Sequence, residues 1–255
     1  MLFGIWSILL LACQEDIDQA DADDEMYTNE LAESEALLAR EVDELWQFSE
    51  EASAATENGR VQSSYCATAT VHGNTLVLDF GSGCTGPVYG RVRTGKVMIQ
   101  QDSTGRSHTI TFDNYSVDGR GVEGQIEVER AADYGSATRT LTHLTVTYED
   151  GKTTVISGTE QVQWVGGQGD GDPKNNLFKI TGTLSGTDRA GRSFTSVTIE
   201  PILVNLGCDK YLRVSGIKEV TLEENRKHTI DFGDGSCDNV ITVTTPRRTF
   251  EVTMR

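Results

Sequence analysis

The chain has 255 residues, of which 37% are hydrophobic, and it carries a formal net charge of −17. This composition supports a packed core in one large or two small domains, and it excludes a bundle of transmembrane helices. The negative charge is concentrated in residues 14–60, which hold 16 acidic and two basic residues. Such an arm repels phosphate backbones, so we expect no nucleic-acid partner.

The chain begins with a short apolar run, Leu2 to Ala12, that stops at Cys13. A membrane-spanning helix needs about 20 apolar residues, so this run is typical of a signal peptide, residues 1–12. The stretch LLAC at 10–13 resembles a bacterial lipobox, which predicts that Cys13 carries the lipid, palmitate included, and starts the mature chain. The run contains no Lys or Arg, so the α-amine is its only positive charge. The alternatives are an ordinary signal peptide and a buried helix that contains Cys13.

Residues 13–25 are polar and acidic and contain almost no apolar side chains. Such a segment buries too little apolar surface to fold, so it predicts a disordered tether to the lipid. Acidic residues directly after a lipidated cysteine also act as a surface-export signal in some bacteria. We therefore expect an exported protein that is lipid-anchored in the outer membrane, with exposure at the cell surface as a further prediction.

Residues 26–57 show apolar side chains at helical spacing, and Asn58-Gly59 supplies a stop signal. The stripe consists of Leu31, Leu38, Val42, Leu45, Trp46 and Phe48. We predict one amphipathic helix that covers a face or an open end of the sheet that follows it. The alternative is a helix that binds a partner.

The period changes to two in residues 58–255, which we predict to be a single β domain. Alternating runs include Val122–Val128, Leu144–Tyr148 and Val197–Ile199. Turn signals separate roughly a dozen strands, at Gly73-Asn74, Gly105, Asp118-Gly119, Asp150-Gly151 and Gly191. Neighbouring strands should pair as antiparallel meanders. The predicted fold is mainly β, a curved sheet that resembles a sandwich or a barrel, with one N-terminal α-helix.

Four cysteines remain when Cys13 is set aside, an even number that suggests two disulfides in an exported protein. The phrase DFGxGC occurs once as DFGSGCT at 79–85 and once in a variant form, DFGDGSCD, at 231–238. Each copy carries one cysteine and has a second one upstream. The repeat therefore predicts the pairs Cys66–Cys84 and Cys208–Cys237. The alternative is four free thiols.

The repeated phrase predicts a structural corner in each copy. Its glycines permit backbone angles that other residues avoid, and Asp79 and Asp231 can accept hydrogen bonds from turn amides. Calcium is a weaker hypothesis, because the first copy lacks counterparts of two of the acids. The weak calcium candidates are Asp231, Asp234 and Asp238, together with Asp170 and Asp172 in the segment GGQGDGDPKNN. We expect no metal or other cofactor.

Several stretches together resemble a family of uncharacterised secreted lipoproteins of Bacteroidota-type bacteria. The matching stretches are DFGSGCTG at 79–86, GRVRTGK at 90–96, FDNY at 112–115, ITGTLSGTDRAGRSF at 180–194 and DFGDGSCDN at 231–239. With the lipobox and the acidic helix, the likeness covers most of the chain. It implies a secreted, lipid-anchored and mostly β protein, and no catalytic residue.

Two features suggest binding rather than chemistry. Arg91, Arg93 and Lys96 form a basic cluster that suits an acidic glycan or a partner's carboxylate, although cross-strand pairing with Glu127 or Glu129 is the alternative. Trp164 suits a platform on which sugars stack, or else a core position at a strand end. We therefore expect a non-catalytic binding, accessory or structural module whose partner is a glycan or an envelope protein. The alternative function is an extracytoplasmic enzyme acting on polysaccharide.

Overall fold

The computed structural model describes residues 39–46, 66–86, 90–167, 175–208, 213–223 and 226–254. The predicted signal peptide, Cys13 and the acidic tether lie outside the described residues. So do most of the predicted helix and the calcium candidates Asp170 and Asp172. No helix in the described part of the chain has the length and hydropathy needed to span a membrane.

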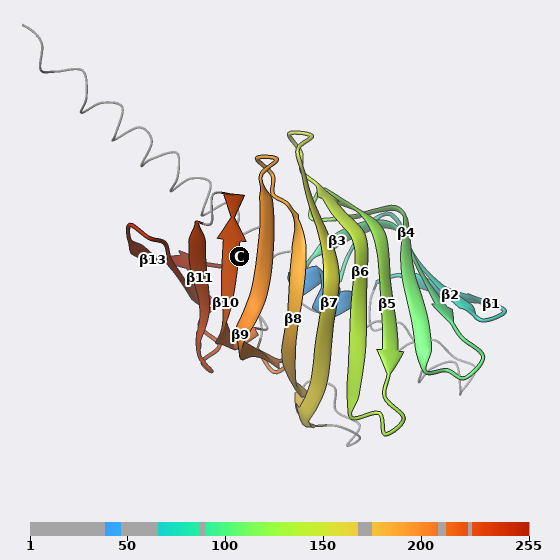
Figure 1. Ribbon diagram of the computed structural model, residues 1–255. Coiled ribbons are helices and arrows are strands. Elements are labelled where there is room, and N and C mark those ends of the chain that lie inside the picture. The colour runs from blue at the N-terminus through green and yellow to red at the C-terminus, as the bar shows by residue number, and fades with distance from the viewer. Residues whose placement is uncertain are drawn as a thin grey trace, which may run out of the picture.

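Thirteen antiparallel strands form one sheet in which every strand pairs with its neighbours in sequence (Figure 1). The strands are β1 (Thr68–His72), β2 (Thr75–Thr85), β3 (Val92–Gln101), β4 (Ser107–Val117), β5 (Arg120–Arg130), β6 (Ser136–Thr147), β7 (Thr153–Gly166), β8 (Leu177–Thr187), β9 (Ser193–Asn205), β10 (Arg213–Leu222), β11 (Lys227–Asp234), β12 (Val240–Thr244) and β13 (Thr249–Thr253). This confirms the predicted curved antiparallel meander. The sheet stays open, with β1 and β13 at its two edges.

The predicted turn residues connect the strands. Asp118 and Gly119 between β4 and β5 have φ values of 49° and 77°, the pair of positive angles that a two-residue hairpin turn requires. Gly73, Gly105, Gly151 and Gly191 also have positive φ at the turns where the sequence predicts them. These turns are short, so each strand folds back directly onto the strand before it.

Register shifts bend the sheet, because a bulge places an extra residue on one strand and increases its local twist. Such shifts interrupt nearly all the long pairings, including β5 with β6 near Gly124 and β6 with β7 near Gly158. The strands approach closely at both glycines. A Cβ at Gly124 would lie 2.5 Å from the carbonyl oxygen of His143, and one at Gly158 would lie 2.3 Å from that of Thr183.

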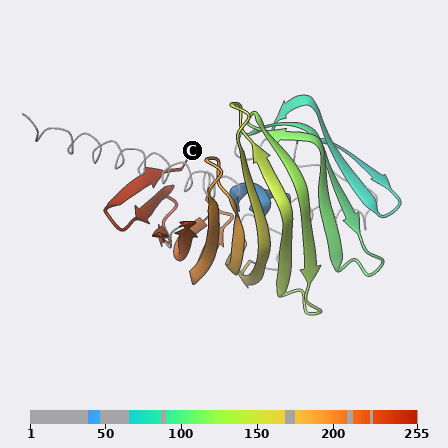
Figure 2. The same cartoon turned by 45° about the horizontal axis from the view of Figure 1, so that its top comes forward.

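Residues 39–46 form a helix that lies against the concave face of the sheet (Figures 1 and 2). This confirms that part of the predicted helix and its position over the sheet. The inward residues of the strands form a single apolar core with Val42, Leu45 and Trp46 of the helix. Fully buried members of this core from the strands include Ile99, Ile110, Ile126, Leu144, Ile156, Ile180 and Ile202.

Val197 and Ile199 on β9 differ from the usual pattern, because both are exposed, by 36% and 58% of their surface. The inward positions of this part of β9 hold Phe194 and Ser196 instead. The alternation of the sequence is therefore present on β9, but the apolar side chains of this run face solvent.

Candidate functional site

The helix presents acidic side chains to a set of basic side chains on the concave face of the sheet. Glu41, Asp43 and Glu44 are each only 2% exposed, although acids are rarely buried in proteins. Their partners come from strands far apart in the sheet. We distinguish a first ion-pair cluster, made of Arg40, Glu41, Glu44, Arg91, Arg93 and Tyr115, from a second ion-pair cluster, made of Asp43, Arg139, Glu160, Arg213 and Lys218.

In the first ion-pair cluster, Arg91, directly before β3, and Arg93, within β3, hold the two glutamates of the helix. Arg91 Nη1 lies 2.8 Å from Glu41 Oε2 and 3.3 Å from Glu44 Oε1. Arg93 Nη2 pairs with Glu44 Oε2, and Arg93 Nε donates to the hydroxyl of Tyr115 at 3.1 Å. The Tyr115 hydroxyl in turn donates to Glu41 Oε1 at 2.6 Å. Every one of these side chains is almost fully buried, so solvent screens the pairs weakly.

Burial also shifts the protonation of this cluster. It raises the pKa of the Glu44 carboxyl and outweighs the opposing positive charge of Arg91. Burial raises the pKa of the Tyr115 phenol well above its usual value, and the negative charge of Glu41 acts in the same direction. Tyr115 therefore keeps its proton and serves as a hydrogen-bond donor to the helix.

In the second ion-pair cluster, two arginines bridge one acid of the helix to one acid of the sheet. Arg139 on β6 donates to Asp43 Oδ1 at 2.7 Å and to Glu160 Oε2 at 2.6 Å. Arg213 on β10 donates from Nε to Asp43 Oδ2 at 3.1 Å, and its Nη2 lies 3.9 Å from Glu160 Oε1. This cluster therefore ties the helix to β6, β7 and β10 at once.

Glu160 is ionised within the second cluster. Its burial alone would raise the pKa, but the positive charges of Arg139 and Arg213 outweigh that effect and lower the pKa to about 2. A carboxylate with so low a pKa is a poor proton donor at neutral pH. The chemistry of this cluster is that of a structural clamp rather than of a general acid.

An aromatic box holds the end of the described helix. The ring of Trp46 makes edge contacts with Trp164 at 4.8 Å and with Phe178 at 4.7 Å between centroids. Trp164 and Phe178 also contact each other, at 4.8 Å. Trp164 is thus half-buried against the core, and its ring packs on the chain's own aromatics.

The structure separates the predicted basic cluster. Arg91 and Arg93 point into the interior and pair with the helix, whereas Lys96 is 44% exposed and lies 3.7 Å from Asp79 on β2. The alternative of cross-strand pairing holds for Lys96, although its partner is Asp79 and not Glu127 or Glu129, whereas Arg91 and Arg93 pair with acids of the helix.

Both copies of the repeated phrase form the predicted corner. Gly81 N donates to Asp79 Oδ1 at 2.8 Å, and Gly233 N donates to Asp231 Oδ1 at 2.9 Å. The two glycines have φ values of 61° and 99°. The corners are closed by the disulfides Cys66–Cys84 and Cys208–Cys237, which confirms the predicted pairing.

The calcium candidates of the second copy serve their own turn. Asp231 accepts from Gly233 N, Asp234 accepts from the amide and hydroxyl of Ser236, and Asp238 accepts from Val240 N at 3.0 Å. No group of three acids, histidines or cysteines suited to a metal ion occurs within the described ranges.

Sequence reasoning missed the residues that form the second ion-pair cluster. Arg139, Glu160 and Lys218 stand at inward positions of their strands. Two positions away on the same face lie buried apolar residues, namely Ala137 and Leu141 for Arg139, Val162 for Glu160 and Val220 for Lys218. A charged residue in register with the apolar side of a strand was the signal that could have identified them. Their partner Asp43 could not be found this way, because it lies on the helix.

Comparison of the chain with protein-family models, with curated proteins and with solved structures finds no match. The resemblance to envelope lipoproteins therefore stays a prediction.

Proposed function

We propose that the chain is an exported envelope protein, lipid-anchored in the outer membrane through Cys13, that acts as a non-catalytic binding or accessory module. The observation that carries this proposal is the pair of disulfides at equivalent corners of the sheet. Stable disulfides are typical of exported proteins and rare in the reducing cytosol. With the lipobox-like LLAC ahead of an acidic segment, they favour an extracytoplasmic position at a membrane surface.

The ion-pair clusters weigh against catalysis by their carboxylates. Each buried carboxylate of the two clusters is engaged by an arginine, by Tyr115 or by both. The alternative function, an enzyme acting on polysaccharide, requires two carboxyl groups flanking an open cleft, one of them able to give up a proton. Asp43 and Glu160 are instead bridged by the guanidinium groups of Arg139 and Arg213.

The lipid anchor is tested by growing the producing bacterium with an alkyne analogue of palmitate and comparing the chain with its Cys13→Ser variant. We expect labelled, membrane-bound protein from the natural chain and unlabelled protein from the variant. Gln14→Ala is the matched control, because it alters the neighbouring position and leaves the thiol in place. Label that persists in Cys13→Ser would contradict the anchor.

Surface exposure and activity need separate measurements. Protease treatment of intact cells should degrade the chain if it faces outward, and should spare it if it faces the periplasm. Incubation of the purified chain with a panel of bacterial and plant polysaccharides tests the enzymatic alternative, since release of new reducing ends would overturn the binding module. Retention on a glycan array, or crosslinking to one envelope protein, would support it.

A further inference from the structure

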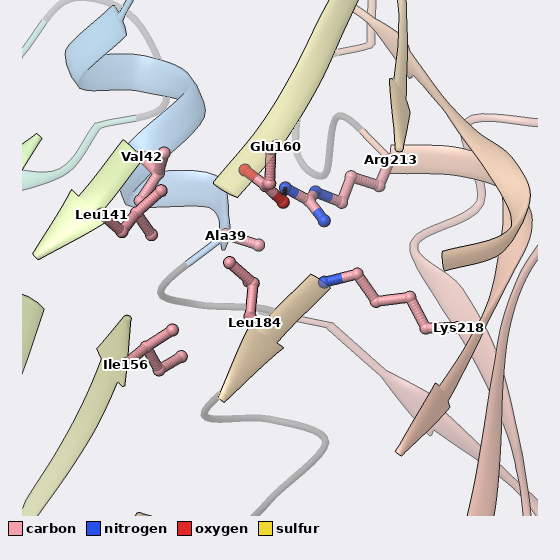
Figure 3. Close-up of a pocket in the computed structure, with 8 residues that line it drawn as sticks. All are labelled: Ala39, Val42, Leu141, Ile156, Glu160, Leu184, Arg213 and Lys218. Atoms are coloured by element: carbon pink, nitrogen blue, oxygen red, sulfur yellow. Dashed lines mark ion pairs between the residues drawn. The ribbon is translucent and has the colours of Figure 1, made fainter. Parts of the chain in front are cut away.

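The space between the described helix and the concave face of the sheet is too small for a ligand. Side chains from both, among them Val42, Ile156 and Leu184, enclose a space that holds about one water molecule (Figure 3). A partner of the sheet would therefore find more room at its two edges, β1 and β13.

β1 is an edge strand that lacks the usual protection against pairing. It pairs with β2 on one side and with no strand of the described ranges on the other (Figure 1). Proteins commonly protect such an edge with charged side chains, proline or a bulge, because its unpaired backbone groups can bind another strand. β1 reads TATVH, without Asp, Glu, Lys, Arg or Pro, and its register with β2 has no shift. The edge is therefore open to a further strand.

The hairpin turn determines which backbone groups of β1 face the open side. Gly73 has a φ of 62° and begins the two-residue turn 73–74, so His72 at the base of the turn exchanges hydrogen bonds with β2. Such residues alternate along an antiparallel ladder with residues whose backbone groups point away. In β1 the second kind are Ala69 and Val71. Their amides and carbonyls have no partner within the described ranges.

The apolar core also reaches this edge without being covered. On the concave side, Val71 pairs with Leu76, Leu76 with Ile99, and Ile99 with Ile110. Their exposed fractions rise toward the edge, from 0% at Ile110 through 1% and 5% to 48% at Val71. The row of core residues thus ends at an uncovered valine, which a strand added beyond β1 would shield from water.

The register of β1 matches a second copy of the same strand. Two antiparallel β1 strands centred on Thr70 place Ala69 of each copy opposite Val71 of the other. These are the residues whose backbone groups face the open side, so each pair exchanges both of its hydrogen bonds. All five residues of β1 are then paired, and no like charges meet across the two-fold axis.

The opposite edge of the sheet does not suit the same arrangement. β13 reads TFEVT, with Glu251 at its centre. Symmetric pairing about that centre would place two Glu251 carboxylates directly opposite each other, which destabilises a strand pair. Pairing of β1 with β13 of another copy would leave an open edge at both ends, so it would produce filaments instead of a closed dimer. Only β1 suits a closed, symmetric contact.

We propose that two copies of this chain associate edge to edge through β1, in an antiparallel pairing that is symmetric about Thr70. Each open edge covers the other, and the two sheets become one. The contact is a single strand of five residues on each side, so the dimer is weak and its population depends on concentration. This inference goes beyond the binding module proposed above and does not depend on the lipidation of Cys13.

A cysteine on the two-fold axis tests this register. The Cα atoms of the two Thr70 residues would lie about 4.5 Å apart, as in a non-hydrogen-bonded antiparallel pair, and a disulfide can bridge that distance. The full chain with Cys13→Ser and Thr70→Cys should therefore form a disulfide-linked dimer on mild oxidation, seen on a non-reducing gel. Thr68→Cys is the matched control on the same face of β1. It would lie about 14 Å from its own counterpart and should stay monomeric.

A charge on the axis tests the contact without a crosslink. Sedimentation of the Cys13→Ser chain over a hundredfold range of concentration should show its mass rising from that of a monomer toward that of a dimer. Thr70→Glu places like charges opposite each other and should weaken the association by about fivefold or more. Thr181→Glu is the matched control, because it adds the same charge at an exposed position of β8, inside the sheet. It should leave the association unchanged.

The variants share one N-terminus, so differences among them report on β1. A chain that stays monomeric at every concentration, with Thr70→Cys unlinked, would overturn the inference, whether another segment or another partner covers the edge. Equal linkage of Thr68→Cys would overturn the register, and growth into species larger than a dimer would favour head-to-tail pairing. Each variant must keep the melting temperature of the Cys13→Ser chain, so that misfolding is not read as a loss of contact.

Discussion

Arg139 on β6 donates a 2.7 Å hydrogen bond to Asp43 of the helix, and the two residues are 96 positions apart in the chain. The same guanidinium holds Glu160 on β7 at 2.6 Å. None of the three side chains is more than 3% exposed. The helix is therefore attached to the sheet by a charge arrangement that only the complete fold assembles.

Arg139→Met should be strongly destabilising, because it leaves two buried carboxylates with one arginine between them. We expect the free energy of unfolding to fall by about 3–5 kcal/mol, measured by urea denaturation. Arg189→Met is the control, since Arg189 pairs with Asp150 at the surface, where solvent and salt screen the pair. Equal losses of unfolding free energy in the two variants would show that the buried bridge contributes no more stability than the surface pair.

His108 should make the stability depend on pH. Burial, followed by the positive charge of Arg130, lowers the pKa of His108 from 6.5 to about 3. As the pH falls below 6.5, the unfolded chain therefore takes up a proton that the folded chain does not. The contribution of His108 to the free energy of unfolding is complete above pH 6.5. Below that pH it falls by about 1.4 kcal/mol per pH unit until the pH approaches 3.

Urea denaturation between pH 6.5 and 5 measures this effect above the ordinary pKa range of exposed carboxylates. His108→Gln should flatten the dependence in this window. The control is His72→Gln, which changes an exposed residue of β1 and should keep the slope of the natural chain. A natural chain whose stability is constant across the window would contradict the buried neutral imidazole.

The two disulfides should contribute similar amounts of stability. They close segments with sequence separations of 18 and 29, and the entropy of loop closure grows only with the logarithm of length. Replacing either pair by alanines should lower the free energy of unfolding by about 3 kcal/mol. The measurement is the urea midpoint of each double variant with and without a reducing agent. A variant lacking Cys66 and Cys84 that matches the natural chain would refute the equivalence of the corners.

Gly158→Ala should destabilise the sheet more than Gly151→Ala. Both glycines have positive φ, so alanine is strained at either position. The added methyl would meet the carbonyl oxygen of Thr183 at Gly158, but nothing within 4 Å at Gly151. We expect a further loss of about 1–3 kcal/mol at Gly158, read from thermal or urea unfolding. Equal losses would mean that the bulge relaxes to admit a side chain.

Local signals explain why the strands, turns and corners could be predicted. The Asp118-Gly119 turn and the hydrogen bonds of Asp79 and Asp231 involve residues within a few positions of one another. Such local interactions can be predicted from the order of the residues alone. The disulfide pairing could be predicted because a repeated phrase resolved the choice among three connectivities. The helix around Val42 and Leu45 followed from its apolar stripe.

The interior charges could not be predicted in the same way. Arg93 shares the inward side of β3 with Val97 and Ile99, and Lys96 lies on the other side, so strand alternation alone separates the two side chains. The partner of Arg93 is Glu44 of the helix, 49 positions away, and no local pattern indicates that pair. The partners of Arg213 depend on how the helix sits on the curved sheet, which no local pattern encodes. Val197 and Ile199 show the converse, since an alternating apolar pair faces outward without any local signal.

The long reach of the helix contacts has a consequence for the order in which the protein matures. Asp43 emerges early during synthesis or translocation, but its partner Arg213 follows 170 residues later. Contacts of such separation are slow to form, because the intervening chain must be ordered before they are made. Until β10 has arrived, Asp43 lacks one of its two arginine partners and the core of the sheet is incomplete. The chain thus completes its core only near the end of its own production, and a chaperone that shields half-finished sheets would act within that interval.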